Sequence, residues 1–318
     1  MNWIFETNYA VFSVFASLLI AEVIGSVLLL FYYDAAKAKV LQFAVPIWEV
    51  TGTFGAFWVV TGDMAYPTLL IPVATIFGAL LTMFLFFFVA RNSAIVFAEF
   101  ITKRKWLDEK KLYKAYAVST LLLAIILLIL LSSLVSGAGV LSNASPLSTN
   151  FDFAAWTSQV GSWLFVIGTV LIAIGVAPVF FDIRFLARRL APLALLGILL
   201  SVGAYYEFSP SFITAALAVP ILLTLLAVLL YLPKKTAPIV TNKAIFITVL
   251  SIIIFSLQPL VYPRFVGQRL PIDALTTTGP MALAFYQTTW AGSALLAVML
   301  LGYVWIAFRQ NPATAPAH

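Results

Sequence analysis

Long apolar runs separated by short polar segments dominate the pattern along the chain. A helix needs ~20 consecutive apolar residues to cross the hydrocarbon core of a bilayer. Runs that reach or approach this length lie at 9–33, 41–62, 64–90, 114–136, 155–181, 190–208, 211–233, 244–263 and 284–308. The pattern therefore predicts an all-α membrane protein with about nine transmembrane helices.

Short connections and regular glycines indicate how some of these helices pack. Only the turn around Gly62–Asp63 separates the second run from the third, and only 209–210 separates the sixth from the seventh, so both pairs are expected to form tight hairpins. Gly161, Gly168 and Gly175 recur every seven residues along the fifth run. Small residues on one face let a neighbouring helix approach closely.

The distribution of basic residues predicts the orientation. If the N-terminus is outside, the inward loops hold all but two of the 18 lysines and arginines, Arg91 among them, and only Arg264 and Arg269 fall outside. This is the asymmetry of the positive-inside rule. We therefore expect the N-terminus outside and the C-terminus inside, with the segment 91–114 beginning as an amphipathic helix at the inner surface.

The composition excludes several classes of protein. With 63% hydrophobic and 9% charged residues, the chain is too apolar for a soluble domain. It has no cysteine, which excludes disulfides and thiolate metal sites, and its one histidine is the last residue, His318. No membrane helix can thus offer a histidine to a haem or a catalytic metal. The basic excess is a topology signal, so no nucleic-acid partner is expected.

Two glutamates lie inside apolar runs, where a charge is costly. From the predicted inner helix ends, Glu22 is ~16 Å and Glu49 ~14 Å deep, counted at the helical rise. No basic residue is expected at this depth, so each carboxyl group should hold a proton near neutral pH. With Ser26 and Thr53 one turn away, they could pass protons from the inner face. Alternatively, each is a protonated acid bonded to a backbone carbonyl across a helix interface.

The residues around Glu49 resemble a known family. The stretch PIWEVTGTFGAFWVVTGDMAYP (46–67) is similar to the second helix of subunit II of cytochrome bd-type quinol oxidases, which carries Pro-x-Trp-Asp followed by Gly-Asn-Glu. Pro46, Trp48 and Glu49 match, with Glu for Asp, whereas 50–52 depart from Gly-Asn-Glu.

Three further segments extend the resemblance to about residues 9–308. The first helix resembles the family's FDMGVGM region, which places Glu22 near an acidic position. NFDF (150–153) looks like the family's FFDL, and 258–308 resembles its last loop and helix.

The resemblance implies two four-helix bundles and a peripheral ninth helix. The first bundle would be 1–136, an outer loop would follow at 137–154, and 155–318 would hold the second bundle, the ninth helix and a short C-terminal tail. It also implies a haem-free second subunit of a quinol:oxygen oxidoreductase in a prokaryotic plasma membrane, inactive alone. The expected partner is subunit I of similar fold, which carries the haems (b, with or without d) and oxidises quinol; the family also allows a small accessory membrane subunit. Glu49, Glu22, Thr53 and Ser26 would form part of the cytoplasmic proton path, with Trp48 packed beside Glu49.

Two other functions remain open from the residues. An ion-coupled transporter would use a carboxylate in mid-membrane, and transporters often contain helices broken by glycine and proline. A haem-free, quinone-binding anchor of another respiratory complex would share the topology and the missing histidines.

Overall fold

The computed structural model describes residues 3–101, 108–140, 151–208, 243–258, 262 and 270–309, without the side chains of 70, 72, 184, 270 and 303–309. Its long helices are α1 (Trp3–Phe31), α2 (Tyr33–Ala65), α3 (Leu70–Phe100), α4 (Glu109–Ser136), α6 (Val160–Phe180), α7 (Arg184–Phe208) and α13 (Gly279–Arg309). The shorter elements are α5 (Phe153–Thr157), α10 (Lys243–Ser256), β1 (Leu270–Pro271) and α12 (Ile272–Leu275).

The prediction of an all-α membrane protein is confirmed. Seven helices of the described part are long and apolar enough to cross a membrane. The apolar helix α10, of 14 residues, overlaps the run predicted at 244–263. The helix predicted at 211–233 lies outside the described residues.

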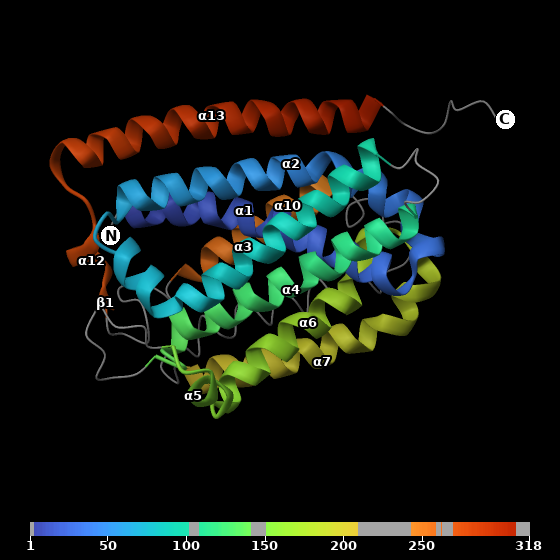
Figure 1. Cartoon of the computed structure of the whole chain (residues 1–318), viewed down its shortest axis with the longest axis horizontal. Helices are drawn as coiled ribbons and strands as arrows, with labels where there is room; N and C mark the ends of the chain where they lie inside the picture. The colour runs from blue at the N-terminus through green and yellow to red at the C-terminus, as the bar shows by residue number, and fades with distance from the viewer. Residues whose placement is uncertain are drawn as a thin grey trace.

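Helix α1 is at the centre of the arrangement (Figure 1). It packs against α2, α4, α6 and α10, while α3 packs on α4 and α7 packs on α6. Helix α13 lies along the edge of the molecule beside α2. Within the described part, α2 and α3 share no extended contact. The division into bundles at 1–136 and 155–318 stays a prediction.

The largest core cluster joins helices from both halves of the chain. Leu28 of α1, Ile47 of α2, Ala117 of α4, Ala177 of α6 and Phe246 of α10 are all buried members. Because lipid is as apolar as these side chains, helices in a membrane associate through close packing more than through the hydrophobic effect.

Glycines bring α6 and α7 into backbone contact, as their spacing predicted. A Cβ on Gly168 would lie 2.8 Å from the carbonyl oxygen of Gly197, and one on Gly175 would lie 2.6 Å from the backbone nitrogen of Ala194. Real Cβ atoms are not found so close to backbone, so only glycine fits here.

Local signals set several helix ends. The carboxylate of Asp108 accepts a hydrogen bond from the backbone N–H of Lys110 and caps α4, and Asp152 caps α5 in the same way. Gly137 ends α4 in the left-handed conformation, at φ 75°.

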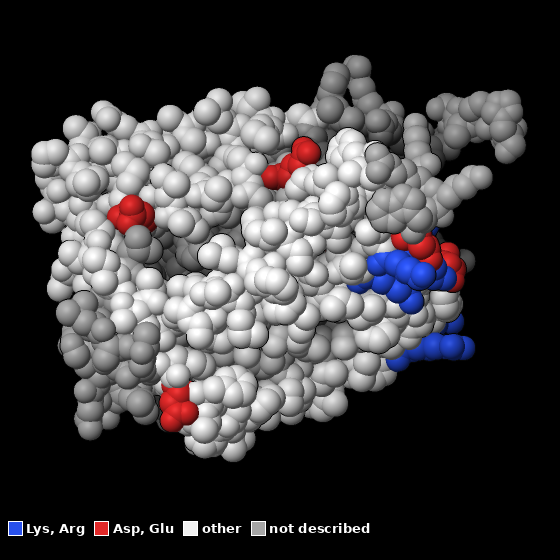
Figure 2. All heavy atoms as spheres, viewed as in Figure 1, with Lys and Arg blue, Asp and Glu red and all other residues white. Residues whose placement is uncertain are grey.

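Lysines and arginines gather at one end of the molecule (Figure 2). There Lys37 pairs with Glu109 at 2.8 Å and Lys110 with Asp34 at 2.9 Å, which ties the start of α2 to the start of α4. A basic end is typical of the cytoplasmic side. The orientation with the N-terminus outside stays a prediction.

The segment that begins at Arg91 differs from the expectation. Helix α3 does not end near residue 90 but continues to Phe100. Residues 91–100 therefore extend a membrane-crossing helix, and placing Arg91 in an inner loop was wrong. The basic run at 103–105 lies outside the described residues.

Candidate functional site

Glu22 lies in the interior of the helix assembly. Its side chain on α1 has no exposed surface, and Arg91 Nη2 on α3 is 3.2 Å from its Oε2. The phenol of Tyr116 on α4 donates a hydrogen bond to the same oxygen at 3.1 Å. Three helices thus meet at one carboxylate.

The expectation that no basic residue lies at membrane depth was therefore wrong. Arg91 is only 1% exposed, and its guanidinium also lies over the ring of Phe88, 5.5 Å from the ring centroid. An arginine keeps its charge in proteins, so a buried arginine requires a counter-charge nearby. Glu22 supplies it.

Ser26 follows Glu22 by one turn on α1 and is also fully buried. Its hydroxyl has no hydrogen-bond partner within the described part, and neither does the second oxygen of Glu22, Oε1. The two groups predicted to act together thus lie on one helix face with unused hydrogen-bonding capacity.

Glu49 has a different environment. It lies midway along α2 with its side chain exposed on the surface of this chain. The described residues provide no hydrogen bond or ion pair to its carboxyl group. Thr53, also exposed, donates its hydroxyl hydrogen bond to the backbone carbonyl of Glu49 at 2.9 Å.

Trp48 turns toward the interior. It is half-buried and packs against the central core cluster. Glu49 projects from α2 with its side chain exposed. In the part of the chain that the structure describes, therefore, neighbouring side chains leave Glu49 exposed.

The predicted site residues thus fall into two groups. Glu22 and Ser26 are buried on α1, whereas Glu49 and Thr53 lie on the outer face of α2. Helices α1 and α2 pack together, but no hydrogen bond within the described part joins the two groups.

Sequence reasoning missed Arg91 and Tyr116. The signal for Arg91 was present, because Ala94, Ile95 and Ala98 continue a helical apolar face beyond it and are buried in α3. Tyr116 was hidden in an apolar run, where a tyrosine is usually an interfacial anchor.

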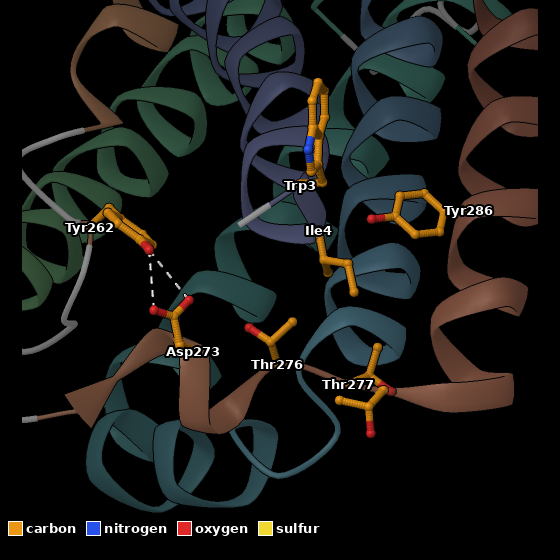
Figure 3. Close-up of a pocket in the computed structure, with 8 residues that line it drawn as sticks. Trp3, Ile4, Tyr262, Asp273, Thr276, Thr277 and Tyr286 are labelled. Carbon is orange, nitrogen blue, oxygen red and sulfur yellow. Dashed lines mark hydrogen bonds between the residues drawn. The ribbon is translucent and has the colours of Figure 1, made fainter. Parts of the chain in front are cut away.

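A pocket of about 500 Å³ opens between the start of α1, the segment after α12 and the start of α13 (Figure 3). Its lining includes Trp3, Thr276 and Tyr286, and the hydroxyl of Tyr262 donates a hydrogen bond to Asp273 there, at 3.1 Å. Neither Glu22 nor Glu49 borders it.

Metal-ligating residues do not cluster in the described part: no three of the His, Cys, Asp and Glu side chains there lie close enough to hold one ion. Methionine can serve as an axial haem ligand, but Met83, Met281 and Met299 are each about half exposed on helix surfaces.

No protein-family model and no curated protein matches this sequence. A solved structure does match. It is the bd oxidase from Geobacillus thermodenitrificans, at 20% sequence identity and a TM-score of 0.70, with 96% of this chain and 98% of that chain covered. The resemblance found in the sequence is thus confirmed at the level of fold: this protein has the fold of a bd oxidase chain.

Proposed function

We propose that this protein is the haem-free second subunit of a bd-type quinol:oxygen oxidoreductase, whose complex oxidises quinol and reduces oxygen to water. The likeness in fold, over nearly the whole length of both chains, carries the proposal. The motif Pro46-x-Trp48-Glu49 on α2 supports it from the sequence side. The chain alone would be inactive.

The residues of this chain do not fit a haem. Haem iron in such proteins needs strong axial donors such as histidine, and the one histidine here is residue 318, beyond the last membrane helix. The haems of the complex would therefore belong to the partner subunit, and no electron-transfer step is assigned to this chain.

The outer face of α2 supports a lateral partner. Gln42, Glu49, Thr53 and Val60 are all exposed, and their spacing places them on one stripe of the helix. Polar groups at membrane depth usually face protein or water, not lipid. A homologous haem-bearing subunit seated on this stripe would bury them.

Helix α2 is also shaped for close approach. A Cβ on Gly52, next to this stripe, would meet no other element of the described part within 4 Å. Glycine at a helix surface lets a neighbouring backbone come near. The partner would contact α2 here, and a small accessory membrane subunit could occupy another face.

Glu49 is the group best placed to deliver protons across this interface. Oxygen reduction consumes protons, and a carboxyl group inside a membrane assembly is a usual relay for them. Glu49 would accept a proton from the cytoplasmic side and release it toward the partner, with the Thr53 hydroxyl beside it. Glu22 and Ser26 would extend the polar path within this chain, linked to Glu49 through water.

Purification from a native membrane in mild detergent tests the proposal. Mass spectrometry should identify one polytopic haem-binding subunit in equal amount with this chain. Soluble iron–sulfur subunits would identify a membrane anchor of another complex instead. A chain that purifies alone and remains folded would favour a transporter.

A further inference from the structure

Within the described part of the chain, several buried polar atoms at the Glu22–Arg91 pair have no hydrogen-bond partner. Glu22 Oε1 and Ser26 Oγ come from α1, and Arg91 Nε comes from α3. Glu22, Ser26 and Arg91 are at most 1% exposed. Because Ser26 is one turn from Glu22 on α1 and Arg91 contacts Glu22, the unpartnered atoms of these three residues lie close to the ion pair.

Leaving such atoms unpaired is costly. A buried polar group without a hydrogen bond lowers the stability of the folded protein by ~1–3 kcal/mol, and a charged group lowers it by more. Native proteins usually satisfy such groups with internal water, which makes about three hydrogen bonds per molecule. Tyr116 already uses its hydroxyl on Glu22 Oε2, so it leaves Oε1 unsatisfied.

The chemistry of the three groups selects the ligand. The carboxylate oxygen only accepts hydrogen bonds, the Arg91 Nε–H only donates, and the serine hydroxyl does both. A bound cation would be repelled by Arg91, and an anion by Glu22. Water can donate to the oxygens and accept from the guanidinium.

We propose that water is bound beside the Glu22–Arg91 ion pair, between α1 and α3, with hydrogen bonds to Glu22 Oε1, Ser26 Oγ and Arg91 Nε. The site is a hydrated charge pair inside the membrane-crossing helices. The proposed water does not depend on the proposed oxidase function, because it follows from the need of these buried atoms for hydrogen-bond partners.

Further polar groups continue from this site toward the basic end of the molecule. Tyr113 lies one turn from Tyr116 on α4 and donates a hydrogen bond to Glu99 of α3. Glu99 follows Arg91 by eight residues, about two helical turns, on the same helix. Water could exchange with the basic end along these groups.

Hydroxyl-radical footprinting by X-ray radiolysis, read by mass spectrometry, tests the site in the purified full-length complex. Radicals form from water in place, so a buried side chain next to bound water is modified. Tyr116 and Phe77 are both 1% exposed, but Phe77 belongs to an apolar cluster. With each rate normalised to that in the denatured chain, Tyr116 should be modified several times faster than Phe77.

A matched pair of variants locates the water. Ser26→Ala removes one of its partners and should lower the modification of Tyr116 severalfold. Ser13→Ala, on the same helix, is the control: Ser13 is also buried, but its hydroxyl already bonds the carbonyl of Tyr9 at 2.7 Å. A Tyr116 as unreactive as Phe77 in the unmodified protein would overturn the proposal. Equal modification in Ser26→Ala would also overturn it.

Discussion

The guanidinium of Arg91 on α3 lies 3.2 Å from the carboxylate of Glu22 on α1, and both side chains are buried. Helices α1 and α3 each pack on α4 but have no extended contact with one another. The ion pair, with Tyr116 of α4, is therefore a polar connection across the inside of the first four helices. It balances a positive charge that would otherwise be unpaired among membrane-crossing helices.

Removing one member of this pair should destabilise the protein strongly. Arg91→Met leaves the Glu22 carboxylate buried without its counter-charge, and such changes cost roughly 3–5 kcal/mol. The double variant Arg91→Met with Glu22→Leu should recover much of this loss. Thermal unfolding of the purified complex, followed by circular dichroism, measures both.

An exposed ion pair provides the control for this cycle. Lys37 and Glu109 are each about 40% exposed, so Lys37→Met should change the free energy of unfolding by less than about 1 kcal/mol. If Arg91→Met lowered the free energy of unfolding as little as Lys37→Met, the Glu22–Arg91 ion pair would not stabilise the packing of the helices.

The glycine contact between α6 and α7 predicts a second loss of stability. A Cβ on Gly197 would lie 2.5 Å from the carbonyl oxygen of Gly168 and 2.7 Å from the backbone nitrogen of Ile172. Because both atoms are backbone, Gly197→Ala must separate the helices and lower the unfolding temperature. Gly78→Ala, where the added atom meets nothing within 4 Å in the described part, should leave the unfolding temperature nearly unchanged. Equal effects of the two would contradict the packing.

The open space at Gly52 allows the partner surface to be tested separately from the fold. Gly52→Leu should leave the chain folded, since Gly52 lies on the surface of α2 and an added Cβ meets nothing within 4 Å in the described part. In the complex it should block the approach of the second subunit to α2. We expect normal amounts of this chain in the membrane but much less co-purified partner. Unchanged association would place the partner on another face.

Glu49→Gln tests the proton role without changing the shape of the side chain. The amide cannot release and regain a proton as a carboxyl group does, so quinol-driven oxygen uptake should fall by roughly tenfold or more. The haem spectrum of the complex should stay the same, because this chain is proposed to hold no haem. Thr53→Val is a milder companion, since among the described residues the Thr53 hydroxyl bonds the backbone carbonyl of Glu49 and no side chain. Full activity in Glu49→Gln would remove Glu49 from the proton path.

The helices could be predicted from the sequence because length and apolarity suffice for that purpose. Seven of the predicted runs correspond to helices of crossing length, and the glycine spacing correctly predicted a close helix contact. The main error was the end of the third helix. Polar residues such as Arg91 and Asn92 usually mark a helix end in a membrane protein, but here α3 continues past them because Glu22 compensates the charge.

The faces of the helices could not be predicted in the same way. A helix that is apolar all round gives no pattern to distinguish a lipid-facing side from a buried one. Glu22 and Glu49 have a similar sequence context and predicted depth, so the sequence suggested the same role for both, a protonated carboxyl group on a proton path. The structure instead buries Glu22 against Arg91 and exposes Glu49, a difference that depends on how α1, α2 and α3 pack.

The optical spectrum of the complex that co-purifies with this chain, reduced minus oxidised, tests the oxidase assignment most directly when it is combined with quinol-driven oxygen uptake. A bd-type complex should give haem bands that are retained after removal of free haem, and it should consume oxygen when quinol is added. A colourless preparation that contains this chain in folded form and takes up no oxygen would contradict the assignment.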